Sequence, residues 1–214
     1  MGKLESMKKN SSQEERNEVL VTALNSQNSM LIEMALELEP DIAVGGERLL
    51  KYAISSCNMK LLKELLEISK ITQNEDIMWN AVYLAMTLDS IAWFDILNQL
   101  FEKGGSKDAA LTIAWYTNRH TLDFIMWLVK QGAKIRVLSY SIKKRQCLVE
   151  KIFEQGYGKS LHFVDDAFEE FGNNLCKSNK QNVVKRTIQD RPDLVHELNK
   201  IAVTGGYTEI VKIL

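Results

Sequence analysis

The sequence predicts an all-α protein assembled from helix-turn-helix repeats, and three observations support that prediction. The 214 residues include only two prolines, Pro40 and Pro192, so little interrupts helix formation. No long stretch alternates apolar and polar residues in the way that the strands of a sheet protein do. Several segments instead place apolar residues at positions i, i+1 and i+4, the spacing that gives a helix one buried face.

One sequence frame recurs along the chain: a small-residue helix end, a turn, and an apolar stripe on a second helix. The frame is clearest at residues 202–214 and appears again at 53–66 and 23–36. The second apolar residue of each second helix marks seven units with a mean spacing of about 30 residues. These markers are Ile32, Leu62, Leu97, Ile125, Val149, Val184 and Val211. The sequence therefore predicts about seven irregular repeats over residues 17–214, preceded by a polar leader at 1–16.

The repeats resemble the ankyrin repeat, whose closing Gly-Ala is present as Gly132-Ala133. Variants of this ending occur at Gly104-Gly105 and Gly156-Tyr157, and Pro192 takes the place of the glycine after one unit. The glycine is expected to end the second, outer helix in a left-handed conformation that other side chains resist. The resemblance implies an ankyrin-like α-solenoid, and a stack of unrelated helical hairpins is the alternative.

Two departures from the family pattern have structural consequences. The Thr-Pro-Leu-His opening of the ankyrin repeat is absent from every unit, so we expect the first helices to be capped in other ways. The last unit reaches Leu214 inside its second helix, before the expected glycine stop. We therefore expect the repeat domain to be truncated there and to continue in a longer protein.

Composition narrows the function classes. The chain carries 27 basic and 28 acidic residues, for a formal net charge of -1, so broad binding to nucleic acid or to anionic membranes is not expected. No run approaches the ~18 apolar residues that a membrane span requires. The three cysteines stand far apart in the sequence, which is typical of reduced thiols in a cytosolic compartment. We expect a cytoplasmic monomer.

The residues that could carry catalysis form no recognisable constellation. None of the three histidines has a second ligand at metal-binding spacing, and the carboxylates that follow His162 fit a solvated helix start. Residues 156–160 resemble the end of a phosphate-binding loop, but Phe153 stands where that loop needs a glycine. We therefore predict no catalytic, cofactor-binding or metal-binding residues, and no enzyme activity.

Aromatic residues next to polar ones predict a partner-binding patch. Trp115 and Tyr116 are adjacent and cannot share one face of a helix, so at least one is expected near the surface. Asn118 and Arg119 follow at once, and large aromatic and arginine side chains dominate protein interfaces. The predicted patch is completed by two residues of the preceding unit, Tyr83 and Asp89.

A second predicted feature is a basic strip. Its residues Lys143, Lys144 and Arg145 are placed on the first helix of unit five, with Lys177 and Lys180 at comparable places in unit six. Stacked repeats would align these side chains into a surface suited to an acidic partner.

These features predict a protein–protein interaction scaffold that binds a partner protein on the concave face of the solenoid. The alternative is a targeting or substrate-recruiting domain of a larger enzyme whose catalytic part lies beyond residue 214. The irregular repeats and the Asn- and Lys-rich usage resemble divergent ankyrin proteins with which intracellular bacteria or large viruses engage host proteins. That resemblance implies an effector acting in the host cytoplasm.

Overall fold

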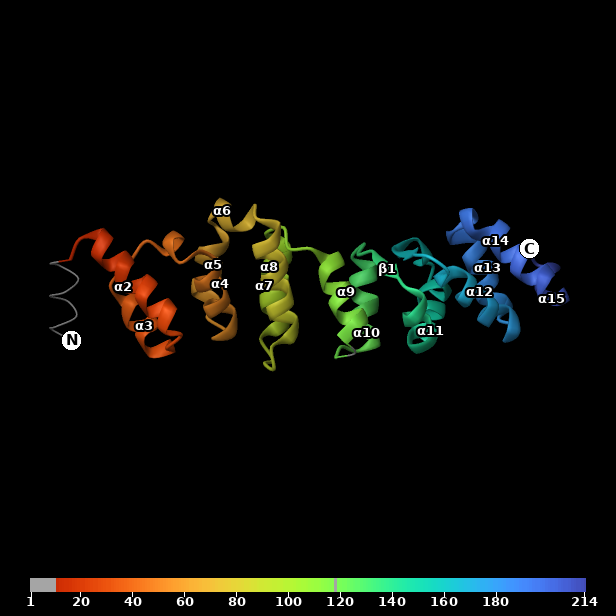
Figure 1. Ribbon diagram of the computed structural model, residues 1–214, viewed down its shortest axis with the longest axis horizontal. Coiled ribbons are helices and arrows are strands. Elements are labelled where there is room, and N and C mark those ends of the chain that lie inside the picture. Colours follow the sequence, from red (N-terminus) through yellow and green to blue (C-terminus); the bar gives the residue numbers. More distant parts are fainter. Residues whose placement is uncertain (1–10, 118) are drawn as a thin grey trace. The chain divides into compact units, whose positions relative to one another are not determined.

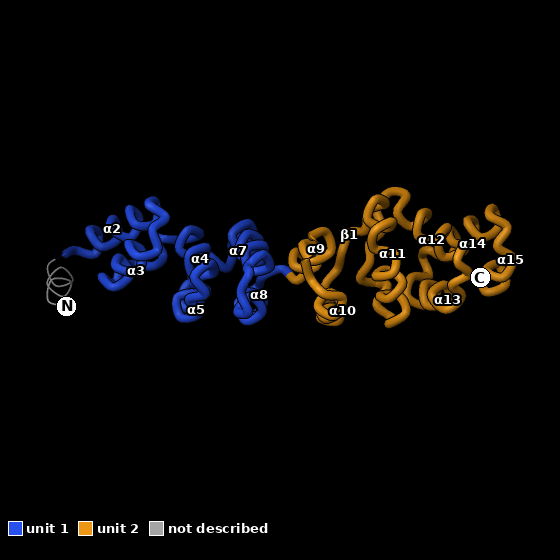
Figure 2. The backbone as a smooth tube through the Cα atoms, turned by 90° about the horizontal axis from the view of Figure 1, so that it is seen from below, with its two compact units in different colours: residues 1–106 blue, residues 107–214 orange. Residues whose placement is uncertain are grey.

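The computed structural model describes residues 11–117 and 119–214, and it is mostly helical (Figure 1). These residues form fourteen α-helices, three 3-10 turns and one two-stranded sheet. The predicted all-α class is confirmed at this level, and the short sheet is an addition that the sequence did not predict. The chain divides into two compact units, unit 1 (residues 1–106) and unit 2 (residues 107–214), coloured separately in Figure 2.

Within residues 11–106, unit 1 consists of three helical hairpins and their connections. The paired helices are α2 (Gln13–Ser26) with α3 (Ser29–Glu37), α4 (Gly46–Ser55) with α5 (Met59–Leu66), and α7 (Glu75–Thr87) with α8 (Trp93–Glu102). The connections include a 3-10 turn, η1 (Ile42–Val44), and a short helix, α6 (Ser69–Thr72). Leucines such as Leu20, Leu49 and Leu62 are fully buried between these helices and form the core.

The first helix of unit 1 begins earlier than expected. Helix α2 begins at Gln13, inside the segment 1–16 predicted as a polar leader. The Ser12 hydroxyl accepts a hydrogen bond from the Glu15 amide at 3.2 Å, and the Glu15 carboxylate accepts one from the Ser12 amide at 2.8 Å. This reciprocal capping satisfies two amides at the helix start, which fixes the beginning of α2 there. The first part of the predicted leader, residues 1–10, lies outside the described residues.

Unit 2 contains three further hairpins, with one long helix between the first and the second, in the residues that the structure describes. The paired helices are α9 (Lys107–Thr117) with α10 (Leu122–Lys130), α12 (Ala167–Lys177) with α13 (Gln181–Asp190), and α14 (Val195–Thr204) with α15 (Thr208–Val211). The long helix is α11 (Ser139–Glu154), and two 3-10 turns are η2 (Gly158–Ser160) and η3 (Pro192–Leu194). Strands β1 (Ile135–Val137) and β2 (Leu161–Phe163) flank α11 in the sequence and pair in parallel, with Ile135 opposite Leu161.

The helix-turn-helix predicted for unit five is wrong. Its two expected helices, one with Lys143–Arg145 and one with Val149, are a single continuous helix, α11. The residues between them, Gln146 to Leu148, include no glycine, asparagine or proline that would favour a left-handed turn. The helix therefore continues through the position where the repeat would turn.

Four of the six hairpins share one backbone geometry at the turn between their helices. Just before the second helix, Gln27, Cys57, Asn179 and Gly206 adopt left-handed conformations with φ of 54°, 53°, 50° and 71°. In three of these turns the next amide donates a hydrogen bond back into the first helix. The bonds run from Asn58 to Ala53 (2.8 Å), from Lys180 to Leu175 (3.1 Å) and from Tyr207 to Ala202 (2.9 Å). The sequence frame at 23–36, 53–66 and 202–214 thus corresponds to one repeated turn.

The glycines predicted to end outer helices adopt the expected conformation. Gly104, Gly132 and Gly156 have φ of 97°, 85° and 80°, at the ends of α8, α10 and α11. An added Cβ at any of the three would meet nothing within 4 Å. The left-handed backbone, rather than crowding, therefore explains glycine at these positions.

The first helices are capped in varied ways, as the missing Thr-Pro-Leu-His opening predicts. Asn74 caps α7 with its side chain, accepting a hydrogen bond from the Ile77 amide at 3.0 Å. Helices α4 and α14 begin without a side-chain cap. The first helices therefore share no common capping motif.

Replacing Gln27 by glycine should raise the free energy of unfolding by about 0.5–1 kcal/mol, because a side chain with a Cβ is strained in the left-handed region. Urea unfolding followed by circular dichroism measures the change. Glu18→Gly is the matched control: it places glycine inside α2 and should destabilise by about 1 kcal/mol. Destabilisation by both substitutions would contradict the left-handed turn at Gln27.

Candidate functional site

A pocket of about 400 Å³ lies between the end of α9 and the start of α11 in unit 2. It combines aromatic, hydroxyl and basic side chains from the two helices. The lining residues are Trp115, Tyr116, Tyr140, Ser141, Lys144 and Arg145. Four of the predicted partner-binding residues (Trp115, Tyr116, Lys144 and Arg145) therefore come together here, although the sequence analysis had assigned them to two separate features. We call this site the α9–α11 pocket.

Trp115 lies at the base of the pocket and not on the surface. Its side chain is only 1% exposed, so the prediction that it is a surface contact residue is wrong. Adjacent residues point to different sides of a helix, and here Trp115 points into the core while Tyr116 points outward. The indole Nε1 is buried and donates no hydrogen bond within the described residues. A buried donor without an acceptor is costly to the fold.

Tyr116 forms one wall of the pocket and is held in place from two sides. It is 36% exposed, as the prediction of a surface aromatic required. Its hydroxyl donates a hydrogen bond of 2.9 Å to the backbone carbonyl of Arg136 in β1. Its ring lies 6.0 Å from the ring of Tyr140, measured between centroids. Burial raises the pKa of the Tyr116 phenol, and the neighbouring Tyr140 adds to that effect, so this wall is uncharged at neutral pH.

The two cations of the pocket stand on the first turns of α11. Neither Lys144 nor Arg145 forms an ion pair within the described residues, and no carboxylate lines the pocket. The pocket also lies at the amino-terminal end of a long helix, where the backbone dipole is positive. Ser141 is buried and its hydroxyl donates to the Leu138 carbonyl at 2.7 Å, which fixes the helix start. The local potential is therefore positive.

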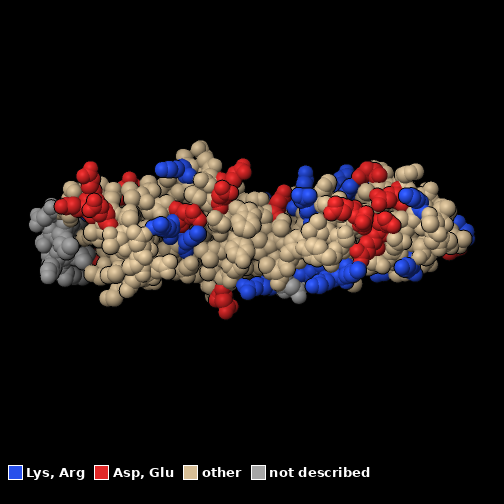
Figure 3. Space-filling model, in the orientation of Figure 1, with Lys and Arg blue, Asp and Glu red and all other residues tan. Residues whose placement is uncertain are grey.

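The predicted basic strip is interrupted by acidic side chains. Lys180 forms an ion pair with Glu150 of α11 at 2.6 Å, and Lys143 lies 3.9 Å from Glu170 of α12. Figure 3 shows acidic side chains over the middle of unit 2 in that view, with basic ones above and below. The expectation of one continuous basic surface is wrong, because α11 itself and the neighbouring helix α12 each contribute a carboxylate next to these lysines.

Arg119 is exposed just after α9 and does not line the pocket. Asn118, the other polar residue of the predicted patch, lies outside the described residues. The predicted patch is thus reduced to Tyr116 at the pocket, with Arg119 beyond its rim.

Tyr83 and Asp89 belong to unit 1, and both are exposed. Tyr83 is 45% exposed and stacks on Trp79 of the same helix, with ring centroids 5.6 Å apart and planes 10° from parallel. Trp79 is itself 47% exposed, and the predicted patch did not include it. The spacing of four residues between Trp79 and Tyr83 was the available signal.

Tyr140 and Ser141 were also missed. Tyr140 precedes Lys144 by four residues and therefore shares its face of α11.

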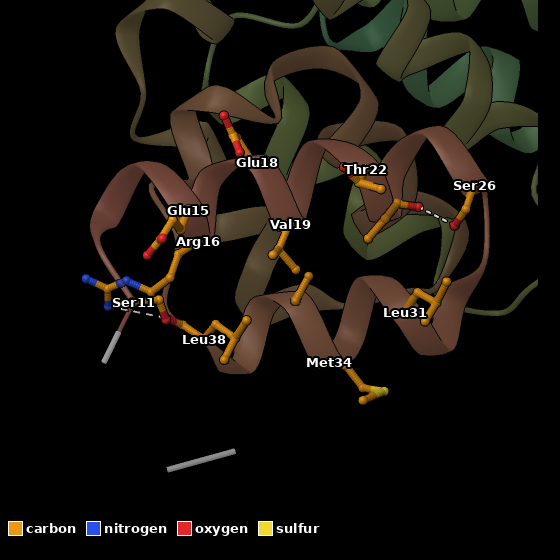
Figure 4. A pocket seen from close by; sticks show the side chains of 12 residues that line it. Ser11, Glu15, Arg16, Glu18, Val19, Thr22, Ser26, Leu31, Met34 and Leu38 are labelled. Carbon is orange, nitrogen blue, oxygen red and sulfur yellow. Dashed lines mark hydrogen bonds between the residues drawn. The ribbon is translucent and has the colours of Figure 1, made fainter. Parts of the chain in front are cut away.

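An apolar groove of about 750 Å³ lies between α2 and α3 in unit 1 (Figure 4). Val19 points from α2 towards α3, and Met34 projects from α3 away from α2. Both side chains are exposed, as is Leu31. The charged residues of its lining are Glu15, Arg16 and Glu18, so the α2–α3 groove has no excess positive charge. It differs in chemistry from the α9–α11 pocket.

The remaining candidates for metal or phosphate binding do not form such sites in the described residues. The described residues hold no group of three or more His, Cys, Asp or Glu side chains placed to bind a metal ion. His162 is exposed on β2. The Gly158 amide, in the segment that resembles a phosphate-binding loop, donates instead to the Asp190 carboxylate at 2.9 Å. No described helix is both long enough and apolar enough to span a membrane.

Comparison with known proteins adds no relative to this description. No protein-family model, curated protein or solved structure matches the chain. The α9–α11 pocket is therefore interpreted from its own geometry.

Proposed function

We propose that this chain is a protein-interaction scaffold of ankyrin-like helical hairpins and that it binds a partner protein at the α9–α11 pocket. The observation that carries the proposal is the convergence of Tyr116 and Tyr140 with Lys144 and Arg145 on one pocket. Tyrosine and arginine are enriched at the energetic centres of protein interfaces. The two tyrosine rings bury a large area at a small cost in side-chain entropy. The hydrogen bond from Tyr116 to β1 fixes one wall before a partner arrives, which lowers the cost of association.

The repeated left-handed turns support the ankyrin-like part of the proposal. Short connections and regular backbone turns hold the hairpins rigidly, and side chains on such hairpins form a preformed surface. On this proposal the chain is a binding protein of the cytoplasm. Its irregular repeats suggest a pathogen factor that engages a host protein.

Affinity capture from a eukaryotic cytosolic extract tests this function. We expect a protein that is captured by the wild-type chain and reduced about tenfold by Tyr116→Ala/Lys144→Glu, because that variant removes one wall and reverses one cation. Trp115→Ala is unsuitable, since its buried side chain supports the fold. Circular dichroism verifies that each variant is folded.

The matched controls use exposed residues elsewhere. Lys185→Glu changes charge by the same amount on α13, and Trp79→Ala/Tyr83→Ala removes the exposed aromatic pair of unit 1. Capture that survives the pocket variant but is lost with the unit 1 variant would overturn the placement of the site. A wild-type chain that captures no protein above the level of an unrelated bait would overturn the function.

A further inference from the structure

Resting on the proposed function, we infer that the α9–α11 pocket recognises a carboxylate, the side chain of a glutamate or aspartate in an acidic segment of the partner. The pocket offers Lys144 and Arg145 as cationic donors, and no carboxylate of the chain lines it. An anionic oxygen entering the pocket gains two charge-assisted contacts and the positive end of the α11 dipole.

The buried indole of Trp115 serves as a reporter for the pocket that it lines. The Trp115 Nε1 group can only donate, and it has no acceptor within the described residues. Its accessible area is below 1 Å², so a ligand oxygen in the pocket does not reach it. The indole therefore reports on binding in the pocket that it lines without contacting the ligand.

The charge and the walls favour a carboxylate. One guanidinium and one ammonium group face the pocket, whereas recognition of a doubly charged phosphate typically uses a cluster of arginines. The rings of Tyr116 and Tyr140 are placed to pack against the methylene groups of a glutamate side chain. The Tyr116 hydroxyl already donates its hydrogen bond to the Arg136 carbonyl, so it fixes the position of the ring and does not donate to the ligand.

Nuclear magnetic resonance of the indole groups tests the inference directly. The chain has four tryptophans, and Trp115→Phe assigns the Trp115 indole signal in a ¹⁵N-labelled sample. The probe is a hexaglutamate peptide with acetylated and amidated ends. We expect it to shift the Trp115 indole signal at millimolar concentration while the other three indole signals stay in place. The same peptide made of glutamine should leave all four signals unchanged.

Charge variants locate the contact. Lys144→Glu/Arg145→Glu should weaken hexaglutamate binding at least about tenfold, because it replaces two attractive charges by two repulsive ones. Lys185→Glu/Arg186→Glu makes the identical change on exposed residues of α13 and should leave the Trp115 response intact. Equal weakening by both variants would show binding through net charge and would overturn the inference.

Two further outcomes also decide the matter. An unmoved Trp115 signal at saturating hexaglutamate overturns the inference, and so does tighter binding of a phosphoserine peptide that moves the same signal. This experiment uses the isolated chain and needs no partner. The chain could capture a protein through the pocket and still show no response to hexaglutamate. That result would leave the proposed function standing and would reject only the inference that the pocket binds a carboxylate.

Discussion

Replacing Phe153 by alanine should lower the free energy of unfolding by about 3–5 kcal/mol, the usual cost of removing a fully buried phenyl ring. Phe153 of α11 is completely buried and stacks with Phe171 of α12 at 5.6 Å and with Phe163 of β2 at 6.3 Å, between centroids. Its ring also lies against Gly158, where an added Cβ would be only 2.3 Å from the ring. The ring thus joins three elements of unit 2, and its truncation to alanine leaves a cavity between them.

Urea unfolding followed by circular dichroism measures this loss. Tyr140→Ala, an aromatic truncation at an exposed position of the same helix, should change stability by less than about 0.5 kcal/mol. A loss below about 1 kcal/mol for Phe153→Ala would show that the phenylalanine cluster is not packed as described.

The second large effect is expected from an exposed residue. Lys180→Met should destabilise the chain by about 1–3 kcal/mol, because it leaves the Glu150 carboxylate buried without its cation. Glu150 is 4% exposed, and it accepts hydrogen bonds from Lys180 Nζ at 2.6 Å and from Gln146 Nε2 at 2.9 Å. The double variant Glu150→Leu/Lys180→Met should recover most of the loss, since no buried charge remains.

The dependence of this loss on pH identifies its cause. A hydrogen bond from Lys180 to Glu150 and the attraction between the two charges raise the pKa of Lys180 above its ordinary value of 10.5, with smaller contributions from Cys147 and Glu154. A raised pKa in the folded state means that the contribution is complete below pH 10.5 and is lost as pH rises through the folded value. The stability difference between wild type and Lys180→Met should therefore be constant from pH 7 to 9 and shrink above pH 10.5.

Lys143→Met is the control for the Lys180 experiments. Lys143 is on the same helix as Glu150, but its side chain is 78% exposed and its nearest carboxylate is 3.9 Å away. Its loss should change stability by less than about 0.5 kcal/mol at any pH. An equally large effect from Lys143→Met would indicate general charge balance rather than the buried pair.

Local signals in the sequence were sufficient for much of the fold. The apolar markers of six units fall in the second helices of the six hairpins. Gly104, Gly132 and Gly156 marked helix ends, because left-handed conformations strongly favour glycine. The same argument failed between Arg145 and Val149, where spacing alone suggested a turn and no turn-forming residue was present. A periodic apolar pattern continues along one long helix and through a hairpin alike. The residues that favour a turn therefore decide whether a segment forms one helix or two.

The candidate site depended on relations that lie outside local spacing. Sequence reasoning identified Tyr116, Lys144 and Arg145 but could not bring α9 and α11 together, because their adjacency results from packing in unit 2. It also could not decide which of Trp115 and Tyr116 faced inward. The short β1–β2 pair was missed for the same reason, since three-residue strands have too few positions to show alternation.

The β1–β2 pair has a consequence for the order in which the chain folds. The helical hairpins join residues that are close in sequence, and such contacts form on the microsecond timescale. Strand β1 can pair with β2 only after the whole of α11 has been placed between them, which closes a loop from Ile135 to Leu161. We therefore expect closure of this loop to follow the formation of the hairpins in unit 2.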